Sequence, residues 1–188
     1  MEDKIHVIDG GVTAARGFQA AGLAAGIKKG GKKDMAMIYS EKPCVCAGTF
    51  TTNVVKAAPV KWDQKVVEES SSAQAVVCNS GIANACTGQE GYNACRSTAQ
   101  AAAQALGIPA DSVLVASTGV IGQQLPVPTL EEGVKNLDYD YRYCEKGSGR
   151  GDRAFRKESY YRRYVQRIRN DPSEYVYHAF FYHYRCRD

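Results

Sequence analysis

The feature of this sequence that most constrains its fold is a set of short apolar runs, each ending in polar or glycine residues. Runs of this length and ending are typical of β-strands. They predict strands at Asp34–Ser40, Ala73–Cys78 and Ser112–Ser117. The first part of the chain is therefore expected to contain a sheet of short strands.

Helices are expected between and after these strands. The segment Glu90–Leu106 is rich in alanine, has high helix propensity and is followed by Gly107-Ile108-Pro109, which ends a helix. A second helix is predicted from Pro128-Thr129 onward, and it carries apolar residues at helical spacing: Leu130, Val134 and Leu137. Strands alternating with helices indicate an α/β (α+β) fold.

The chain changes character near residue 137. Residues 1–137 contain 12 basic and 12 acidic residues, whereas residues 138–188 contain 12 basic and 8 acidic residues, so the whole net charge of +4 comes from the tail. The tail also holds ten of the twelve tyrosines and ten of the twelve arginines. We therefore divide the chain into a first part, residues 1–137, and a tail, residues 138–188.

The overall composition fits a soluble globular protein, with 44% hydrophobic and 23% charged residues. The sequence has no run of about 18 apolar residues that could cross a membrane. The start, Met1-Glu2-Asp3-Lys4, is not followed by an apolar signal region. These features predict a cytoplasmic protein.

The seven cysteines do not form a recognisable metal site. Zinc sites usually present two close pairs of ligands, whereas this chain has one close pair, Cys44 and Cys46, and only three histidines. An odd number of cysteines in a reducing compartment also argues against a disulfide framework. We expect no metal, and small buried thiols instead.

Three glycine-containing turns are candidates for chemistry: Gly10–Phe18, Asn79–Gly88 and Ser117–Gly122. A glycine turn between a strand and a helix can direct several backbone N–H groups at one anion or transient oxyanion. None of the three matches a nucleotide-phosphate motif. Composition alone favours the simpler alternative, in which the glycines only allow tight turns with positive φ.

Five segments follow one another along the first part of the chain: GGVTAARGFQAAGLAAGIKK, KKDMAMIYS, AGTFTTNVVKAAPV, NSGIANACTGQEG and VASTGVIGQQLP. Taken together in this order, they resemble the ornithine acetyltransferases, the bifunctional glutamate N-acetyltransferases of arginine biosynthesis. The resemblance runs from Asp9 to Val134 and departs visibly at Ile82, where that family usually has asparagine.

The resemblance implies a DmpA/ornithine acetyltransferase-like fold, with layered sheets between helices, of which this chain carries the first portion. Members of the family cut themselves before an internal threonine, which becomes the nucleophile of the second piece. This threonine takes the acetyl group from N-acetylornithine and passes it to glutamate, and some members also accept acetyl-CoA. The family assembles as two α and two β chains and needs no cofactor.

The resemblance also assigns a role to Thr118 and Gly119, which correspond to the family's oxyanion hole. The attack on the acetyl group creates a tetrahedral oxyanion, and preorganised hydrogen-bond donors stabilise it. Replacing Gly119 with a β-branched residue is therefore expected to reduce turnover more than folding. The substrate-binding residues cannot be transferred, because the family's IMTTDT, KGSGM and ATML segments do not occur in this reading frame.

Those missing segments become compatible with the tail when it is read one nucleotide over. Residues 138–144 then permit I-M-T-T-D-T, residues 166–171 permit K-G-S-G-M, residues 170–175 permit M-I-H-P-N, and residues 176–188 permit S-T-M-L-F-F-I-T-T-D-A-E. Four motifs in the family's order predict that the tail is an out-of-frame translation and poorly ordered. The chain as written lacks the nucleophile, so it is expected to be inactive alone.

Two other functions remain open at this point. A self-processing aminopeptidase or amidase of related fold would use a similar oxyanion turn. The basic tail, rich in tyrosine and arginine, could instead bind single-stranded nucleic acid by stacking and phosphate contacts. Its small charge makes that second reading weak, so neither nucleic acid nor membrane is an expected partner.

Overall fold

The computed structural model describes the backbone of residues 11–144 and the side chains of residues 11–138. The predicted strands and helices are confirmed, with longer bounds. The elements are a 3-10 turn at Val12–Ala14, β1 (Phe18–Leu23), β2 (Met35–Val45), α1 (Ala58–Ser70), β3 (Ser72–Ile82), α2 (Gly88–Leu106), a 3-10 turn at Ala110–Ser112, β4 (Val113–Val120) and α3 (Val127–Cys144).

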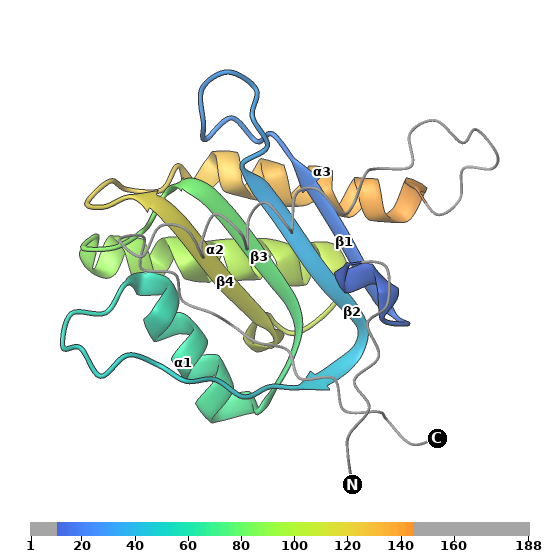
Figure 1. The fold of residues 1–188 in the computed structure, drawn as a ribbon, viewed down its shortest axis with the longest axis horizontal. Coiled ribbons are helices and arrows are strands. Elements are labelled where there is room, and N and C mark those ends of the chain that lie inside the picture. Colours follow the sequence, from blue (N-terminus) through green and yellow to red (C-terminus); the bar gives the residue numbers. More distant parts are fainter. Residues whose placement is uncertain (1–10, 145–188) are drawn as a thin grey trace, which may run out of the picture.

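The strands form one four-stranded sheet in the order β1-β2-β3-β4. β1 and β2 pair antiparallel, β2 and β3 pair antiparallel, and β3 and β4 pair parallel. Because β3 and β4 are parallel, α2 returns the chain from the end of one strand to the start of the next. The carboxyl ends of β3 and β4 consequently lie at the same end of the sheet (Figure 1).

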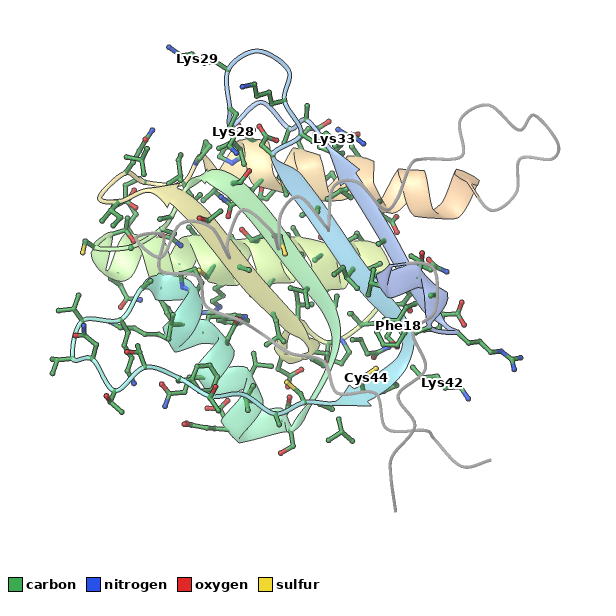
Figure 2. All side chains as sticks on the ribbon, viewed as in Figure 1. Phe18, Lys28, Lys29, Lys33, Lys42 and Cys44 are labelled. Carbon is green, nitrogen blue, oxygen red and sulfur yellow. The ribbon has the colours of Figure 1, made fainter. Side chains whose placement is uncertain are left out.

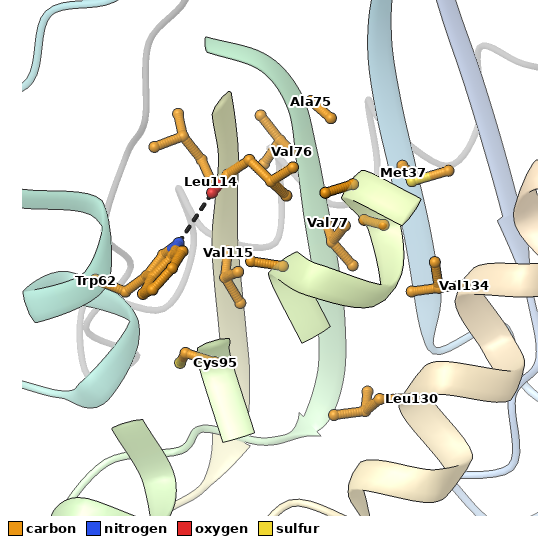
Figure 3. Close-up of a cluster of buried hydrophobic side chains, with 14 of the residues drawn as sticks. Met37, Trp62, Ala75, Val76, Val77, Cys95, Leu114, Val115, Leu130 and Val134 are labelled. Atoms are coloured by element: carbon orange, nitrogen blue, oxygen red, sulfur yellow. Dashed lines mark hydrogen bonds between the residues drawn. The ribbon is translucent and has the colours of Figure 1, made fainter. Parts of the chain in front are cut away.

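Helices α2 and α3 cover one face of the sheet, and α1 lies beside the outer edge of β4 (Figure 1). Alternate strand residues point toward α2 and α3, among them Met37, Val77 and Val115, which are at most 2% exposed. Figure 3 shows them with Leu130 and Val134 of α3. The alanine-rich face of α2 is also buried.

Two elements were not predicted from the sequence. β1 is half-exposed along its whole length, so it lacks the alternation of buried and exposed residues that marks a strand. α1 begins at Ala58, directly before Pro59, and ends at Ser70; the following residue, Ser71, adopts a left-handed conformation with φ 53°. Trp62 fixes α1 on the sheet, because its Nε1 donates a hydrogen bond of 2.9 Å to the Val113 carbonyl of β4.

Helix α3 continues to Cys144, past the boundary predicted at residue 137. Residues 145–188, and with them most of the predicted out-of-frame tail, lie outside the described part of the chain. Within the part that is described, no helix is both long and apolar enough to span a membrane.

Candidate functional site

Two of the three glycine turns lie side by side, at the carboxyl ends of β3 and β4. The strands remain paired into the turns, with Gly81 opposite Gly119 and Ile82 opposite Val120. The Ala83 N–H then donates a hydrogen bond of 2.9 Å to the Val120 carbonyl. The third predicted turn precedes β1 and lies at the opposite end of the sheet, so it takes no part in this site.

Gly119 and Gly81 make a close backbone approach that only glycine allows. Their φ angles are +136° and +121°. A Cβ on Gly119 would collide with the carbonyl group of Gly81 and would lie 2.6 Å from the Ile82 nitrogen. These neighbours are backbone atoms and cannot rotate away, so a β-branched residue at Gly119 is expected to impair folding as well as turnover. The expectation that turnover would suffer more is therefore revised.

The backbone N–H of Gly119 points away from β3, toward the outer edge of the sheet. In a parallel pair, alternate residues direct both backbone groups toward the same neighbouring strand. The Val113 carbonyl accepts from Trp62 and the Val115 N–H donates to Asp63, so odd-numbered residues of β4 face outward. The Val120 carbonyl pairs with β3, which agrees with this alternation. Gly119 is exposed, so its N–H faces an open edge.

The Thr118 side chain lies on the face of the sheet opposite α2 and α3. Side chains alternate along a strand, and Val115 points toward the helices, so Thr118 points the other way. Its register partner is Ser80, whose buried hydroxyl finds no hydrogen-bond partner in the described part of the chain. Thr118 itself is half-buried. A hydroxyl and an outward N–H thus occupy consecutive residues, an arrangement that suits stabilisation of an oxyanion.

A buried hydrogen-bonded bridge holds this turn in place. The Ser117 hydroxyl donates to Asn79 Oδ1 over 2.6 Å, and Asn79 Nδ2 donates to the Ile82 carbonyl over 3.0 Å. Asn79 is only 4% exposed. Because the bridge joins the residue before Thr118 to the turn after β3, it fixes the position of both hydrogen-bond donors. Sequence reasoning missed this role of Asn79, although the residue lies in a quoted segment.

The turn after β3 is instead a closed structural unit. Asn84 is fully buried with φ 51°, and its Nδ2 donates a hydrogen bond of 2.9 Å to the Gly91 carbonyl. Its Oδ1 accepts from the Thr87 hydroxyl over 2.8 Å, and its carbonyl accepts from the Ala58 N–H. The simpler alternative, that glycine turns only shape the backbone, fits this segment.

The ionisable groups behind the site are shifted toward their neutral forms. Burial raises the pKa of Asp63 to about 7, against the opposing effect of the hydrogen bond from the Val115 N–H. Burial, and next the nearby Asp63, raise the pKa of both Cys78 and Cys95 to about 12. These thiols are therefore protonated at neutral pH and are poor nucleophiles. The expectation of small buried thiols is confirmed for Cys46 and Cys95, whereas Cys44 and Cys78 are only partly buried and Cys86 is exposed.

Ser80 and Ser117 lie beside Thr118, but among residues 11–138 neither hydroxyl is hydrogen-bonded to a side chain that could act as a general base. The Ser117 hydroxyl donates to the Asn79 amide oxygen, and the Ser80 hydroxyl has no partner in that range. The described cysteines are free, and no group of three or more His, Cys, Asp or Glu side chains there is arranged to hold a metal. Within this part of the chain, the site consists of donors that can stabilise a negative charge.

Comparison with known proteins identifies the family to which these turns belong. The model of the ArgJ family matches residues 19–155. The chain belongs to the ArgJ family. Among ArgJ relatives, the arginine biosynthesis bifunctional protein ArgJ of Gloeobacter violaceus is 54% identical over 130 residues, which cover 69% of this chain and 32% of that protein. The protein of the same name from Thermotoga neapolitana is 51% identical and is covered to 32% of its length.

Solved ArgJ structures have the same fold. The crystal structure of the bifunctional protein argJ from Bacillus halodurans matches with a TM-score of 0.65 and 41% identity, covering 68% of this chain and 66% of that chain. The ornithine acetyltransferase of Mycobacterium tuberculosis, solved in complex with ornithine, matches with a TM-score of 0.65 and 46% identity, covering 69% and 70%. The mixed α/β fold expected from the resemblance is confirmed.

The chain spans about a third of the length of the curated ArgJ relatives that it matches. The matched third contains both turns of the site. It does not contain the IMTTDT, KGSGM or ATML segments as the chain is written. The ArgJ match therefore covers the two turns that carry Gly81, Thr118 and Gly119.

Proposed function

We propose that this chain supplies the oxyanion hole of an acetyltransferase of arginine biosynthesis. The observation that carries the proposal is the pair of donors at the end of β4, the Thr118 hydroxyl and the outward N–H of Gly119, held by the close approach to Gly81. In the reaction, a nucleophile attacks the acetyl carbonyl of N-acetylornithine, and the carbonyl oxygen becomes negatively charged. Both donors then stabilise this oxyanion more strongly than the neutral carbonyl.

The nucleophile in this proposal is a threonine released by self-cleavage, located in the β chain of the same precursor. A threonine hydroxyl becomes reactive when a base lies beside it, and the freed α-amine is such a base. The acetyl-threonine then transfers its acetyl group to glutamate. Acetyl-CoA is an additional donor in this scheme, no cofactor is required, and two α and two β chains form the enzyme in the cytoplasm.

The specific family match favours acetyl transfer over the amidase alternative. Oxyanion turns look alike in both reactions, so the turn alone does not separate them. The names of the relatives support the choice: the Mycobacterium tuberculosis protein is an ornithine acetyltransferase solved with ornithine. The nucleic-acid alternative rested on residues 138–188, most of which lie outside the described part of the chain.

The test compares two proteins purified in parallel. One is the 188-residue chain as written, and the other is the product of the same gene read one nucleotide over beyond codon 137. Acetyl transfer from N-acetylornithine to glutamate is followed by release of ornithine. We expect transfer only by the second protein. Peptide or amide hydrolysis without transfer to glutamate would support the amidase, and transfer by the 188-residue chain would disprove the assignment of the nucleophile to another piece.

A further inference from the structure

The loop between β1 and β2 brings four lysines to the end of the sheet that carries the site: Lys28, Lys29, Lys32 and Lys33. Asp34 fixes the conformation of this loop. Its carboxylate accepts hydrogen bonds of 2.7 Å each from the backbone N–H groups of Ala25 and Lys28, and the residue is only 1% exposed. The Asp34 carbonyl also accepts from the Ser80 N–H over 2.8 Å. The end of the loop is thus tied directly to β3, next to Gly81.

This anchoring places the side chain of Lys28 against Gly81. The position that a Cβ on Gly81 would take lies 3.1 Å from Lys28 Cγ and 3.7 Å from Lys28 Cε. Gly81 is the register partner of Gly119, so the Lys28 ammonium group lies next to the strand pair that forms the oxyanion turn. Its aliphatic stem packs over the glycine while the charged end extends beyond it.

No acidic side chain within residues 11–138 forms an ion pair with Lys28. The nearest acidic residue in sequence, Asp34, uses one oxygen for the Ala25 N–H and the other for the Lys28 N–H. Lys28 is half-buried as a residue, and its side chain packs against Gly81, the register partner of Gly119. An ammonium group without a carboxylate partner at this end of the sheet is suited to bind an anionic group of the substrate.

We propose that Lys28 binds the α-carboxylate of the amino-acid substrate while the acetyl group occupies the Thr118–Gly119 turn. This inference rests on the proposed function. N-acetylornithine and glutamate each bring an α-carboxylate to the same acetyl-threonine, one as donor and the other as acceptor. A single cation that recognises the shared carboxylate orients both molecules in turn. Lys28 is then a specificity residue of both half-reactions.

Lys29 provides the matched control. It is adjacent in sequence, carries the same charge and is exposed. Figure 2 shows its side chain extending away from the body of the molecule, whereas Lys28 lies beside the sheet. Lys28→Gln and Lys29→Gln therefore remove the same charge from the same loop. If the loop acts only through its overall charge, both variants should lose the same affinity. If Lys28 itself recognises the carboxylate, only Lys28→Gln should lose affinity.

Binding to the 188-residue chain tests Lys28 without any need for turnover. N-acetyl-L-ornithine and its α-amide are titrated into labelled protein, and backbone amide shifts at Gly81 and Gly119 are followed by NMR, which also reports on folding. We expect Lys28→Gln to weaken binding of the acid about tenfold, the range for loss of a charged hydrogen bond. Lys29→Gln should change it less than about twofold. The amide should bind equally weakly to wild type and Lys28→Gln.

Several outcomes would overturn the inference. They are the absence of shifts in the wild-type chain at saturating acid, equal effects of the two lysine variants, or equal affinity of wild type for acid and amide. Binding of inorganic phosphate that competes with the acid and depends on all four lysines would indicate a general anion surface, and would also overturn it.

The product of the gene read one nucleotide over beyond codon 137, here called the frame-restored protein, separates this inference from the proposed function. If it transfers acetyl groups, Lys28→Gln should raise the KM for glutamate about tenfold and leave kcat within about twofold, because the contact exists equally in ground and transition states. If that protein shows no transfer while the binding result holds, the proposed function fails and the carboxylate site stands.

Discussion

The turn after β3 and the turn after β4 are neighbours with opposite properties. In the first, every polar group of the Asn84 side chain has a protein partner, and the residue is fully buried. In the second, Gly119 is exposed and its N–H points away from the sheet, while Val120 and Ile121 are 58% and 63% exposed. Both contain glycines with positive φ. The turn after β3, whose buried polar side chain has all its partners, is suited to maintain the fold. The turn after β4, whose Gly119 N–H faces outward, is suited to bind a ligand.

The same contrast divides β4 itself. Its first half is covered by α1, because Trp62 and Asp63 occupy the outward backbone groups of Val113 and Val115. Its last residues, from Ser117 to Gly119, continue along the same edge beyond those two side chains. Capping of an exposed strand edge prevents unwanted pairing. The uncapped stretch therefore coincides with the donors assigned to catalysis.

The largest effect that would test this comparison is on turnover. Thr118→Val removes one hydroxyl and preserves the shape of the side chain. In the frame-restored enzyme we expect kcat to fall about 100- to 1,000-fold, the usual loss for one oxyanion donor. The measurement is steady-state acetyl transfer, together with urea denaturation to confirm nearly unchanged stability.

Thr87→Val is the matched control in the turn after β3. It removes a hydroxyl that donates to Asn84 Oδ1 in the buried interior. Stability should fall while kcat of the folded fraction stays close to wild type. If both threonine variants lost turnover equally with no difference in stability, the division between a structural and a catalytic turn would be wrong.

The next effect concerns stability alone. Asn84→Ala leaves the Thr87 hydroxyl and the Gly91 carbonyl without their partners and forces alanine into a left-handed conformation. The free energy of unfolding should fall by about 2–4 kcal/mol, since each unsatisfied buried group costs roughly 1–3 kcal/mol. Chemical denaturation of the 188-residue chain measures it. A change below about 0.5 kcal/mol, the level of a surface substitution, would contradict the structural role.

A smaller effect depends on pH and tests how α1 covers β4. Burial raises the pKa of Asp63 from its ordinary 3.8 to about 7 in the folded protein. The folded state therefore holds a proton that the unfolded chain loses earlier. The resulting stabilisation is fully present below pH 3.8 and is lost as the pH rises through 7.

Asp63→Asn removes this titration while keeping an oxygen that can accept from the Val115 N–H. Its stability should vary less than that of wild type between pH 4 and 8. At the upper limit of that range the variant should be more stable by about 1–3 kcal/mol, since one pKa unit corresponds to about 1.36 kcal/mol. The exposed Asp111→Asn is the control. Parallel pH profiles for wild type and Asp63→Asn would contradict the buried, protonated carboxyl.

The sequence predicted the elements whose signals are local. Apolar runs located β2, β3 and β4, and alanine content with Gly107 at the end located α2. β1 was missed because an edge strand with half-exposed residues on both faces has no period of two. α1 was missed because its apolar residues are interrupted by lysine and glutamate, and its position depends on Trp62 reaching a carbonyl 51 residues away.

The site could be predicted in part. Thr118 and Gly119 follow from the resemblance, and they stay predictions until an activity is measured. The reason for Gly119 could not be derived from sequence, because the atoms that exclude a side chain belong to Gly81 on another strand. Lys28 could not be recognised either, since four lysines within six residues are equivalent until Asp34 fixes the loop.

The smallest expected effect is on stability and tests whether the turn after β4 lies outside the core. Val120 and Ile82 are register partners, both β-branched, but Val120 is 58% exposed and Ile82 is 5% exposed. Val120→Thr should change the free energy of unfolding of the 188-residue chain by less than about 0.5 kcal/mol. Ile82→Thr buries a hydroxyl in place of apolar carbons and should cost about 1–3 kcal/mol. Denaturation of both variants measures the difference. Equal losses would mean that the end of β4 belongs to the core, and the turn that carries Thr118 and Gly119 could not then be the open one.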